Sequence, residues 1–330
     1  MTLTILATIV LLALAFDYIN GFHDTANAIA TVVSTGVLTA RDAIIMAAIL
    51  NFSGALIGVE VATTIAKGIA DSSQIVPSVV IAALVSAIAW NLITWYFGIP
   101  SSSSHALVGG LAGAVLAHGG PSVLHTEKLK EVATFLIVSP ILGFAIAMVL
   151  IISILWVVRH QPGHRVNKAF RKLQLVSAAA MAFTHGTNDA QKSMGIIALA
   201  LIIAGKLTAV GAQVPVPLWV KLACATAMAM GTAAGGWKII RTMGAKIVKL
   251  RPIHGFAAET AAAIVLFTTA HFGIPVSTTH VISGAIMGVG ASMNASMVRW
   301  GIAGNIVVAW VLTIPCSMAI AALTLKVISH

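Results

Sequence analysis

The chain alternates long hydrophobic stretches with short polar connections. Eight apolar runs approach the length of a membrane-crossing helix, about 20 residues; they cover residues 3–19, 43–59, 78–97, 132–158, 175–204, 218–236, 257–271 and 302–328. Apolar and polar residues do not alternate along these runs, so the pattern predicts helices rather than the strands of an outer-membrane barrel. The first run has no preceding basic segment and no small-residue cleavage site, so we expect a retained helix rather than a signal peptide.

Composition indicates the same class of protein. Hydrophobic residues make up 59% of the chain and charged residues 8%, and the mean hydropathy is +1.01. Soluble domains contain about 25% charged residues, so the soluble classes are excluded. We predict an all-α polytopic membrane protein with about 10–12 transmembrane segments.

The net charge of +10 reflects 19 lysine and arginine residues that are unevenly distributed. Many of them gather in two polar segments: Arg159, Arg165, Lys168, Arg171 and Lys172, then Lys238, Arg241, Lys246, Lys249 and Arg251. Cytoplasmic loops of membrane proteins are enriched in such residues, so we expect both segments in the cytoplasm and no nucleic-acid partner. Cys224 and Cys316 lie in apolar runs and predict neither a disulfide nor a metal pair.

One motif occurs twice, once in each half of the chain. Phe97–His105 reads Phe-Gly-Ile-Pro-Ser-Ser-Ser-Ser-His, and Phe272–His280 reads Phe-Gly-Ile-Pro-Val-Ser-Thr-Thr-His. Pro140 and Pro315 follow the two copies at the same spacing. Interrupted segments at matching positions of two repeats mark the substrate site of many transporters. The duplication therefore predicts a transporter made of two related halves.

The duplication also predicts how the chain is divided. Residues 1–158 form an N-terminal transmembrane repeat, 159–173 a basic cytoplasmic linker, and 174–330 a C-terminal transmembrane repeat. We expect each Pro-Ser/Thr motif to enter the membrane as a broken, re-entrant hairpin, which gives each half an odd number of crossings. The second repeat is then inverted relative to the first.

A second pair of motifs opens the two halves, Asn20–Ala28 and His185–Ser193. When their glycines are aligned, Asp24 coincides with Asp189, and each aspartate has a polar residue three positions later, on the same helix face. An ionisable residue at membrane depth is costly and is usually kept for function. The alternative is that the aspartates only tie helices together through hydrogen bonds. Glu259 is interpreted as the remaining acid inside an apolar run.

Together, the Gly-x-His-Asp-Thr-Ala-Asn-Ala, Gly-Thr-Asn-Asp-Ala-Gln-Lys and two Gly-Ile-Pro-x-Ser-x-x-His motifs resemble the PiT family of inorganic phosphate transporters, essentially from end to end. The resemblance implies a cation-coupled symporter of orthophosphate and not an enzyme. It also implies two inverted repeats, a homodimer in the bilayer of the plasma membrane, and a central site where all four motifs meet.

Phosphate is an anion whose oxygens need hydrogen-bond donors. Broken helices that start after Pro100 and Pro275 offer backbone N–H groups and a favourable dipole end, and hydroxyl groups add neutral donors. The residues expected to bind phosphate are Ser102, Ser103, Ser104, Ser277, Thr278, Thr279, Gln191 and Lys192. The alternative is that the hydroxyls only satisfy backbone groups freed near the prolines.

A second set of residues is expected to take up the coupling cation or proton. These residues are Asp24, Asn27, Asp189, Asn188, Glu259, His23, His105 and His280. Imidazoles titrate near neutral pH, which suits a proton-coupled step. The alternative for His105 and His280 is that they satisfy backbone carbonyls at the hairpins.

Two departures from the family pattern bear on the coupling ion. Sodium-coupled members resemble one another in having Glu where this chain has Asn51, and Asn where it has Lys192. Both departures remove oxygen ligands for a metal cation and resemble the bacterial low-affinity branch. That resemblance implies proton coupling, with a divalent metal–phosphate complex as a further form of the substrate; sodium coupling is the alternative.

Three other functions fit parts of the pattern. The same cage could carry another tetrahedral oxyanion such as sulfate. An intramembrane hydrolase would use a serine nucleophile with His105 or His280 as base, but one active site does not need two symmetry-related clusters. A passive channel is the third. The sequence contains no nucleotide-binding or dinucleotide-binding motif, so we expect no bound cofactor.

Overall fold

The computed structural model describes residues 1–68, 75–124, 126–208 and 214–329. The first half contains α1 (Leu3–Ser34), α2 (Ala40–Ala55), α3 (Glu60–Gly68), α4 (Pro77–Phe97), α5 (Ser103–Gly119) and α6 (Thr126–Val158). The second contains α7 (Gly163–Ile203), α8 (Leu218–Ala234), α9 (Trp237–Arg241), α10 (Pro252–His271), α11 (Thr278–Met293) and α12 (Trp300–Ser329). Three short turns complete the helices: η1 (Pro121–Val123), η2 (Thr242–Lys246, a π-helical turn) and η3 (Ala295–Met297). The prediction of an all-α fold is confirmed.

Each of the eight apolar runs falls on a helix of its own, within a few residues at its ends. The predicted boundaries are too short in two places. Helix α1 continues through the motif Asn20–Ala28 to Ser34, and α7 begins at Gly163, so most of the basic segment 159–173 is helical rather than a loop. Lys, Arg, Leu and Gln are good helix formers, which explains the early start of α7. The division of the chain into repeats is not affected and stays a prediction.

Five helical segments are long and apolar enough to cross a membrane: α1, α4, Leu129–Val158 of α6, α10 and α12. Two bent pairs, α2 with α3 and α8 with α9–η2, raise the number to seven among the described residues. This is fewer than the 10–12 segments predicted. One reason is that α5 and α11 contain only 17 and 16 residues, whereas a span needs about 20.

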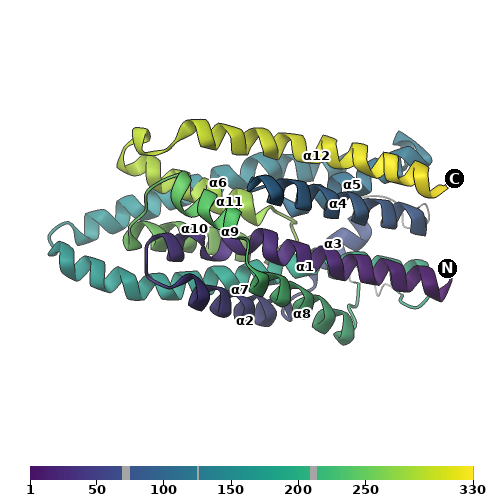
Figure 1. Cartoon of the computed structure of the whole chain (residues 1–330), viewed down its shortest axis with the longest axis horizontal. Helices are drawn as coiled ribbons and strands as arrows, with labels where there is room; N and C mark the ends of the chain where they lie inside the picture. Colours follow the sequence, from purple (N-terminus) through teal and green to yellow (C-terminus); the bar gives the residue numbers. More distant parts are fainter. Residues whose placement is uncertain (69–74, 125, 209–213, 330) are drawn as a thin grey trace.

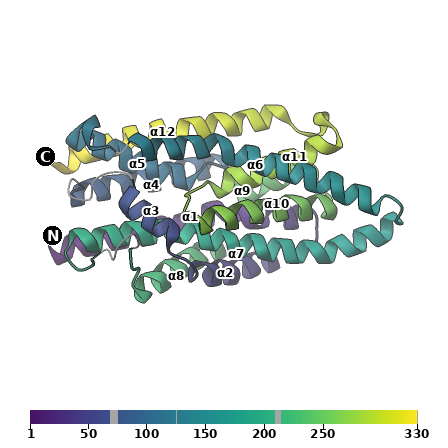
Figure 2. The same ribbon diagram turned by 180° about the vertical axis from the view of Figure 1, so that it is seen from behind.

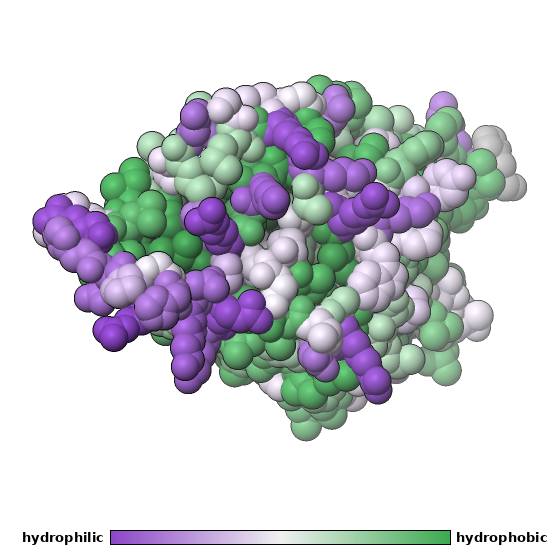
Figure 3. Space-filling model, turned by 60° about the vertical axis from the view of Figure 1, so that its left-hand side comes forward, coloured by the Kyte–Doolittle hydropathy of each residue, from purple (hydrophilic) through white to green (hydrophobic). Residues whose placement is uncertain are grey.

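The helices lie side by side along the longest axis of the molecule (Figure 1). Both termini lie at one end, and the connection between α6 and α7 lies at the other, as the reverse view also shows (Figure 2). Figure 3 brings the α6–α7 end forward, and hydrophilic side chains gather over it while hydrophobic side chains cover much of the flanks. The positive-inside rule favours a cytoplasmic position for the basic α6–α7 end, and this orientation stays a prediction.

The packing of the helices is the same in the two halves. Helix α6 packs on α11 as α12 packs on α5, α1 packs on α8 as α7 packs on α2, and α3 lies on α7 as α9 lies on α1. Helix α1 starts at the end with the termini, whereas α7 starts at the opposite end (Figure 1). These observations support two repeats of one fold, and the inversion of the second repeat remains a prediction that they favour.

Two equivalent glycines bring the central helices into close contact. A Cβ atom on Gly21 of α1 would lie 2.4 Å from the carbonyl oxygen of Met228 in α8. A Cβ atom on Gly186 of α7 would lie 2.3 Å from the carbonyl oxygen of Asn51 in α2. No side chain fits at these distances, so both positions need glycine. The contact brings the two aspartate motifs next to the helices that surround them.

Each Pro-Ser/Thr motif forms a sharp break between two helices that pack against each other. Helix α4 ends at Gly98, whose φ is 66°, and Gly273 after α10 has φ 67°; glycine adopts this left-handed conformation without strain. The side chains of Ser102 and Ser277 then cap α5 and α11 by accepting from the N–H groups of residues 105 and 280, at 3.2 Å each. The two predicted hairpins, α4–α5 and α10–α11, are present.

Candidate functional site

The four motifs meet in the interior of the bundle. Two of them lie within α1 and α7, and the other two form the starts of α5 and α11. The rings of His105 and His280, one from each hairpin, have centroids 4.9 Å apart, so the starts of α5 and α11 are neighbours. Asp24 and Asp189 are 2% and 0% exposed. The structure therefore has a closed site to which both halves contribute.

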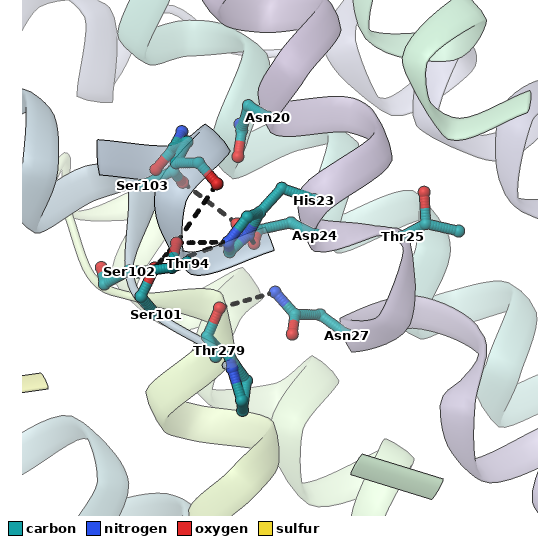
Figure 4. A network of polar contacts seen from close by, with 12 residues as sticks. Asn20, His23, Asp24, Thr25, Asn27, Thr94, Ser101, Ser102, Ser103 and Thr279 are labelled. Atoms are coloured by element: carbon teal, nitrogen blue, oxygen red, sulfur yellow. Dashed lines mark hydrogen bonds and ion pairs between the residues drawn. The ribbon is translucent and has the colours of Figure 1, made fainter. Parts of the chain in front are cut away.

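Asp24 is the centre of a hydrogen-bonded network between α1 and the first hairpin (Figure 4). Its Oδ1 lies 2.7 Å from Nδ1 of His23, and its Oδ2 accepts from Oγ of Ser103 at 3.0 Å. Nε2 of His23 lies 3.0 Å from Oγ1 of Thr94, which in turn accepts from Ser101 at 2.8 Å. A carboxylate, an imidazole and hydroxyls are thus arranged in a continuous chain.

Asn27 connects the first repeat to the second hairpin. Its Nδ2 donates to Oγ1 of Thr278 at 3.2 Å and to Oγ1 of Thr279 at 2.9 Å, the latter visible in Figure 4. Its Oδ1 is buried and has no hydrogen-bond partner among the described residues. This amide therefore holds the two hydroxyls in place and offers a free acceptor. Thr25, on another face of α1, points away from the site (Figure 4).

Asp189 is surrounded by donors, including a buried cation. Nζ of Lys192 lies 2.6 Å from its Oδ1, and Nδ2 of Asn20 donates to its Oδ2 at 3.2 Å. Nε2 of His185 lies 3.5 Å from the same Oδ2. The pair of Lys192 and Asp189 is almost completely buried, at 1% and 0% side-chain exposure. Each charge compensates the other, which a buried ion needs.

Asp24, His185 and Asp189 each offer one ligand atom, and these atoms all lie within 4.8 Å of one another. The arrangement could enclose a small cation between the two repeats. His185 is in turn held by Asn51, whose Oδ1 lies 3.2 Å from Nδ1 of the imidazole and whose Nδ2 donates to Thr232 at 2.9 Å. Asn51, one of the two residues that depart from the sodium-coupled pattern, therefore contacts the site through His185.

The chain matches known phosphate transporters in both sequence and fold. Residues 20–321 match the model of the phosphate transporter family. The chain belongs to this family. Similar proteins include the probable low-affinity inorganic phosphate transporters of Rhizobium meliloti, 51% identical over 97% of this chain and 95% of the relative, and of Bacillus subtilis, 50% identical over 97% and 96%. A solved structure titled "The sodium-dependent phosphate transporter" is 26% identical, covers 99% of both chains and has a TM-score of 0.89.

The resemblance predicted from the four motifs is confirmed by these matches. This member of the phosphate transporter family is a multi-pass membrane protein of the plasma membrane, and it is a transporter rather than an enzyme. The match covers residues 20–321, which include all four motifs. The predicted roles of single residues are not tested by the matches and depend on the geometry.

The six predicted phosphate-binding hydroxyls divide into two groups. Ser102 and Ser277 cap helices, and Ser104 donates to the carbonyl oxygen of Val276 at 3.1 Å. These three hydroxyls bind backbone groups, as the alternative interpretation of the motif predicts. The other three, Ser103, Thr278 and Thr279, contact Asp24 or Asn27 and face the site. They are the hydroxyls that this transporter can turn toward an anion.

Two predicted polar residues of α7 contact backbone groups of neighbouring helices. Oε1 of Gln191 accepts from the N–H groups of Val61 and Ala62 at 2.9 and 3.2 Å and thereby caps α3. Nδ2 of Asn188 donates to the carbonyl oxygen of Leu266 at 2.8 Å, while its Oδ1 is buried without a partner among the described residues. Gln191 is thus engaged on α3 rather than on the hydroxyl-rich helix starts, and its predicted contact with phosphate stays a prediction.

The histidine rings of the two hairpins contact each other at a tilt, and the ring of His280 stacks on that of Trp310. The ring of His280 lies between that of His105 and that of Trp310, with centroids 4.9 and 3.9 Å away. Nδ1 of His280 lies 3.4 Å from the carbonyl oxygen of Leu136, as the alternative of a backbone contact predicts. Nδ1 of His105 and Nε2 of His280 are buried and lack partners in the described part of the chain. Their coupling role stays a prediction.

Glu259 lies in a different cluster from the two aspartates. Its carboxylate accepts from Thr31 and Ser177 at 2.5 Å each and from Nε2 of Gln174 at 2.9 Å. Thr31 follows Asp24 by two helical turns, about 10 Å along α1 toward the C-terminal end of this helix. The sequence placed Glu259 in one set with Asp24, whereas the structure gives it a separate, fully hydrogen-bonded position. Its link to coupling remains a prediction.

Sequence reasoning missed several residues of the site. Asn20 and His185 lie inside the quoted motifs and align with each other around the shared glycine, so that alignment was an available signal. Thr94 lies in the apolar helix α4 and reaches His23 only because the hairpin folds beside α1. Asp17 is a further buried acid of α1, at the end of the first apolar run. Glu259 is therefore not the only other acid at membrane depth.

Proposed function

We propose that the chain is a secondary active symporter of inorganic phosphate that is driven by protons. The observation that carries the proposal is the meeting of two helix starts, three hydroxyls and two aspartates in one closed site of a member of the phosphate transporter family. The choice of substrate is supported by two relatives, from Rhizobium meliloti and Bacillus subtilis. Each is named a probable low-affinity inorganic phosphate transporter.

Phosphate would bind between the first turns of α5 and α11. Both helices are several turns long, so their N-termini carry partial positive charge and free N–H groups that favour an anion. Ser103, Thr278 and Thr279 can rotate their hydroxyls to donate to phosphate oxygens. No arginine is among these groups, which suits a transporter, because bidentate Arg–phosphate pairs are strong and would slow release.

The charges of the site explain why phosphate would need a companion. Asp24 and Asp189 bring two negative charges near the place of the anion, and Lys192 compensates only Asp189. Like charges in a buried site repel strongly because the local dielectric is low. Phosphate therefore enters favourably only after Asp24 and its neighbours have taken up positive charge. This requirement couples the transport of phosphate to the transport of the cation.

Three features favour protons as that charge. Lys192 contacts Asp189 at 2.6 Å, in the place where a metal cation would need an oxygen ligand. Asn51 is neutral and contributes no negative charge near His185. Nδ1 of His23, an imidazole that can hold a proton beside a carboxylate, lies 2.7 Å from Oδ1 of Asp24. Sodium is the second candidate, because the group of Asp24, His185 and Asp189 could enclose it and a similar solved structure is titled sodium-dependent.

The substrate can be free phosphate or a complex of phosphate with a divalent metal. A neutral metal–phosphate complex would lower the electrostatic cost of approaching two aspartates, and the metal would then be cargo. We also expect the transporter to form a homodimer in the bilayer, which size-exclusion chromatography with light scattering in detergent or nanodiscs would test. Monomers at all concentrations would contradict this expectation.

The experiment that tests the proposal is uptake of radiolabelled phosphate into proteoliposomes. A proton gradient, a sodium gradient or neither is imposed at zero membrane potential, with and without magnesium. We expect accumulation with the proton gradient alone. Accumulation with sodium only would replace the coupling ion but keep the substrate. Accumulation of sulfate in place of phosphate would contradict the substrate, and equilibration without accumulation would indicate a channel.

A further inference from the structure

Asp17 is a buried acid of α1 that the proposed phosphate site does not use. It is 0% exposed. Among the described residues, neither of its carboxyl oxygens has a hydrogen-bond partner. This distinguishes it from Asp24, Asp189 and Glu259, which all have donors within hydrogen-bond distance. A buried carboxyl group whose polar neighbours, the Ser193 hydroxyl and the Cys224 thiol, form no well-aligned hydrogen bond with it needs an explanation, because burying its charge is costly.

The groups around Asp17 do not compensate a full negative charge. Ser193 of α7 and Cys224 of α8 lie beside it, and Asp189 and Lys192 of α7 are the charged groups in electrostatic reach. Lys192 is already paired with Asp189 at 2.6 Å. Oγ of Ser193 also lacks a hydrogen-bond partner in the described part of the chain. A proton bound to the carboxyl group would remove this uncompensated charge in the closed conformation.

The position of Asp17 relative to Asp24 suggests a role in transport. The two acids are seven residues apart on α1, which places them on the same side of the helix and about 10 Å apart along its axis. Asp17 precedes Asp24 on α1, and α1 begins at the end of the molecule opposite the α6–α7 connection (Figure 1). With the basic end in the cytoplasm, Asp17 lies on the outer side of the phosphate site.

We propose that Asp17 is a proton-carrying residue on the outer side of the site, which takes up a proton from the exterior and carries it in the closed state. This inference rests on the proposed proton coupling and adds a residue to it. A metal cation is a poorer occupant, because Ser193 and the Cys224 thiol add only one oxygen and one soft ligand. A proton needs no ligand shell and removes the charge directly.

The proton balance of the step is simple. In the outward-open state the ionised carboxyl group of Asp17 forms one O–H bond with a proton from the external solution. Closure buries the neutral acid next to Ser193 and Cys224. In the inward-open state the O–H bond breaks and the proton passes from Asp17 to water that is continuous with the cytoplasm, so one proton moves inward per cycle. No other reactant is needed.

The test uses the full-length protein in sodium-free proteoliposomes at zero membrane potential. Asp17→Asn has nearly the same shape but cannot release a proton. Asp42→Asn is the matched control, because Asp42 is an exposed acid in the first turn of α2, outside the site. Two readouts are compared: phosphate accumulation under a one-unit pH gradient, and phosphate exchange at equal pH and phosphate concentration on both sides.

We expect Asp17→Asn to keep exchange near the wild-type rate and to lose about tenfold in accumulation, the contribution of one coupled proton per pH unit. Asp42→Asn should match the wild type in both readouts, and Asp17→Glu should restore accumulation. In infrared spectra of the closed state, the carbonyl band of a protonated acid should disappear in Asp17→Asn.

Several results would overturn the inference about Asp17 alone. These are wild-type accumulation by Asp17→Asn, unchanged infrared spectra, or the loss of exchange together with accumulation, which would indicate a merely structural role. A wild-type protein that shows exchange but no proton-driven accumulation would instead overturn the proposed proton coupling, and the role of Asp17 with it. The two failures are thus distinguishable.

Discussion

At the scale of single residues, the site depends on how buried charges are compensated. Lys192 and Asp189 form an ion pair at 1% and 0% exposure, whereas Asp24 contacts only neutral donors and an imidazole. Equivalent positions of the two repeats thus carry different charge partners: Lys192 stands where the first repeat has Asn27. We expect this single difference to decide which cation can enter.

The first prediction concerns Lys192. Lys192→Asn removes the ammonium group and places an amide three residues after Asp189, as Asn27 follows Asp24 in the first repeat. Removing one partner of a buried pair costs about 3–5 kcal/mol when nothing replaces it, so the variant should bind a metal cation to recover that energy. We expect sodium to stabilise the variant in thermal unfolding and not the wild type.

The control for this experiment is Lys130→Asn, which removes an exposed lysine that pairs with Glu127 on the surface. Surface pairs contribute little to stability, so this variant should behave as the wild type. Sodium stabilisation of the wild type itself, or of neither protein, would show that Lys192 does not occupy a cation position.

The second prediction separates the two groups of hydroxyls. Ser103→Ala removes the donor that contacts Asp24 and should weaken phosphate uptake, raising KM about tenfold, the loss of one charge-assisted hydrogen bond. Ser277→Ala removes a helix cap and should lower the stability by about 1 kcal/mol, with a smaller effect on KM. Uptake kinetics and thermal unfolding of both variants test the assignment, and equal effects on KM would contradict it.

Much of the central site could be predicted at this scale, because two related motifs place ionisable residues at equivalent positions of the two halves. Asp24, Asp189 and Lys192 were found in this way. The partners Thr94 and Asn20 were not, since their role arises from contacts between helices that are distant in the sequence. The capping role of Ser102 and Ser277 was within reach, because serine before a helix is a preferred cap.

At the scale of elements, each hairpin is held by a threonine of a short helix from the other repeat. Oγ1 of Thr64 in α3 donates to the carbonyl oxygen of Gly273 at 2.7 Å. Oγ1 of Thr242 in η2 donates to the carbonyl oxygen of Gly98 at 3.0 Å. Both contacts fasten the left-handed glycine that precedes a hydroxyl-rich helix start, so both are placed to control how easily a hairpin opens.

The third prediction follows from these contacts. Thr242→Val keeps the shape of the side chain but removes the hydrogen bond, which contributes about 1 kcal/mol. Hydrogen exchange of residues 98–104 should become about fivefold faster, because a loss of that size changes an opening equilibrium by this factor. Residues 273–279 should be unaffected, and Thr64→Val should give the reverse pattern. Equal exchange in both hairpins would contradict separate control.

The fourth prediction concerns the packing of the central helices. Gly186→Ala places a methyl group 2.3 Å from the backbone oxygen of Asn51, so α2 and α7 must separate. We expect a strong loss of stability and of phosphate uptake, measured by thermal unfolding in detergent and by transport. Gly301→Ala is the control, because nothing lies within 4 Å of its added methyl group. Similar stability of both variants would contradict the close packing.

The helices themselves were largely predictable, and the exceptions have physical causes. Apolar runs gave eight helices because hydrophobic length is a local property of the sequence. The helical start of α7 was missed, since charged residues such as Arg165 and Lys168 were interpreted as a loop although they are good helix formers. The short helices α3 and α9 lack membrane-spanning length and depend on tertiary contacts such as the cap from Gln191.

At the scale of the whole molecule, the two repeats form one site that neither could form alone. Asn27 from the first repeat holds Thr278 and Thr279 of the second, and Asn20 from the first donates to Asp189 of the second. The contact between the rings of His105 and His280 joins the two hairpins. A closed site that both halves share is what alternating access requires, because movement of either half can open it to one side.

The measurement that tests this account most directly is cryo-electron microscopy of the purified transporter with and without phosphate. We expect an additional tetrahedral density between the first turns of α5 and α11, within hydrogen-bond distance of Ser103 and of Thr278 or Thr279. Density that contacts residues of one repeat only, or that lies outside the space between the two helix starts, would contradict a phosphate site built from both halves.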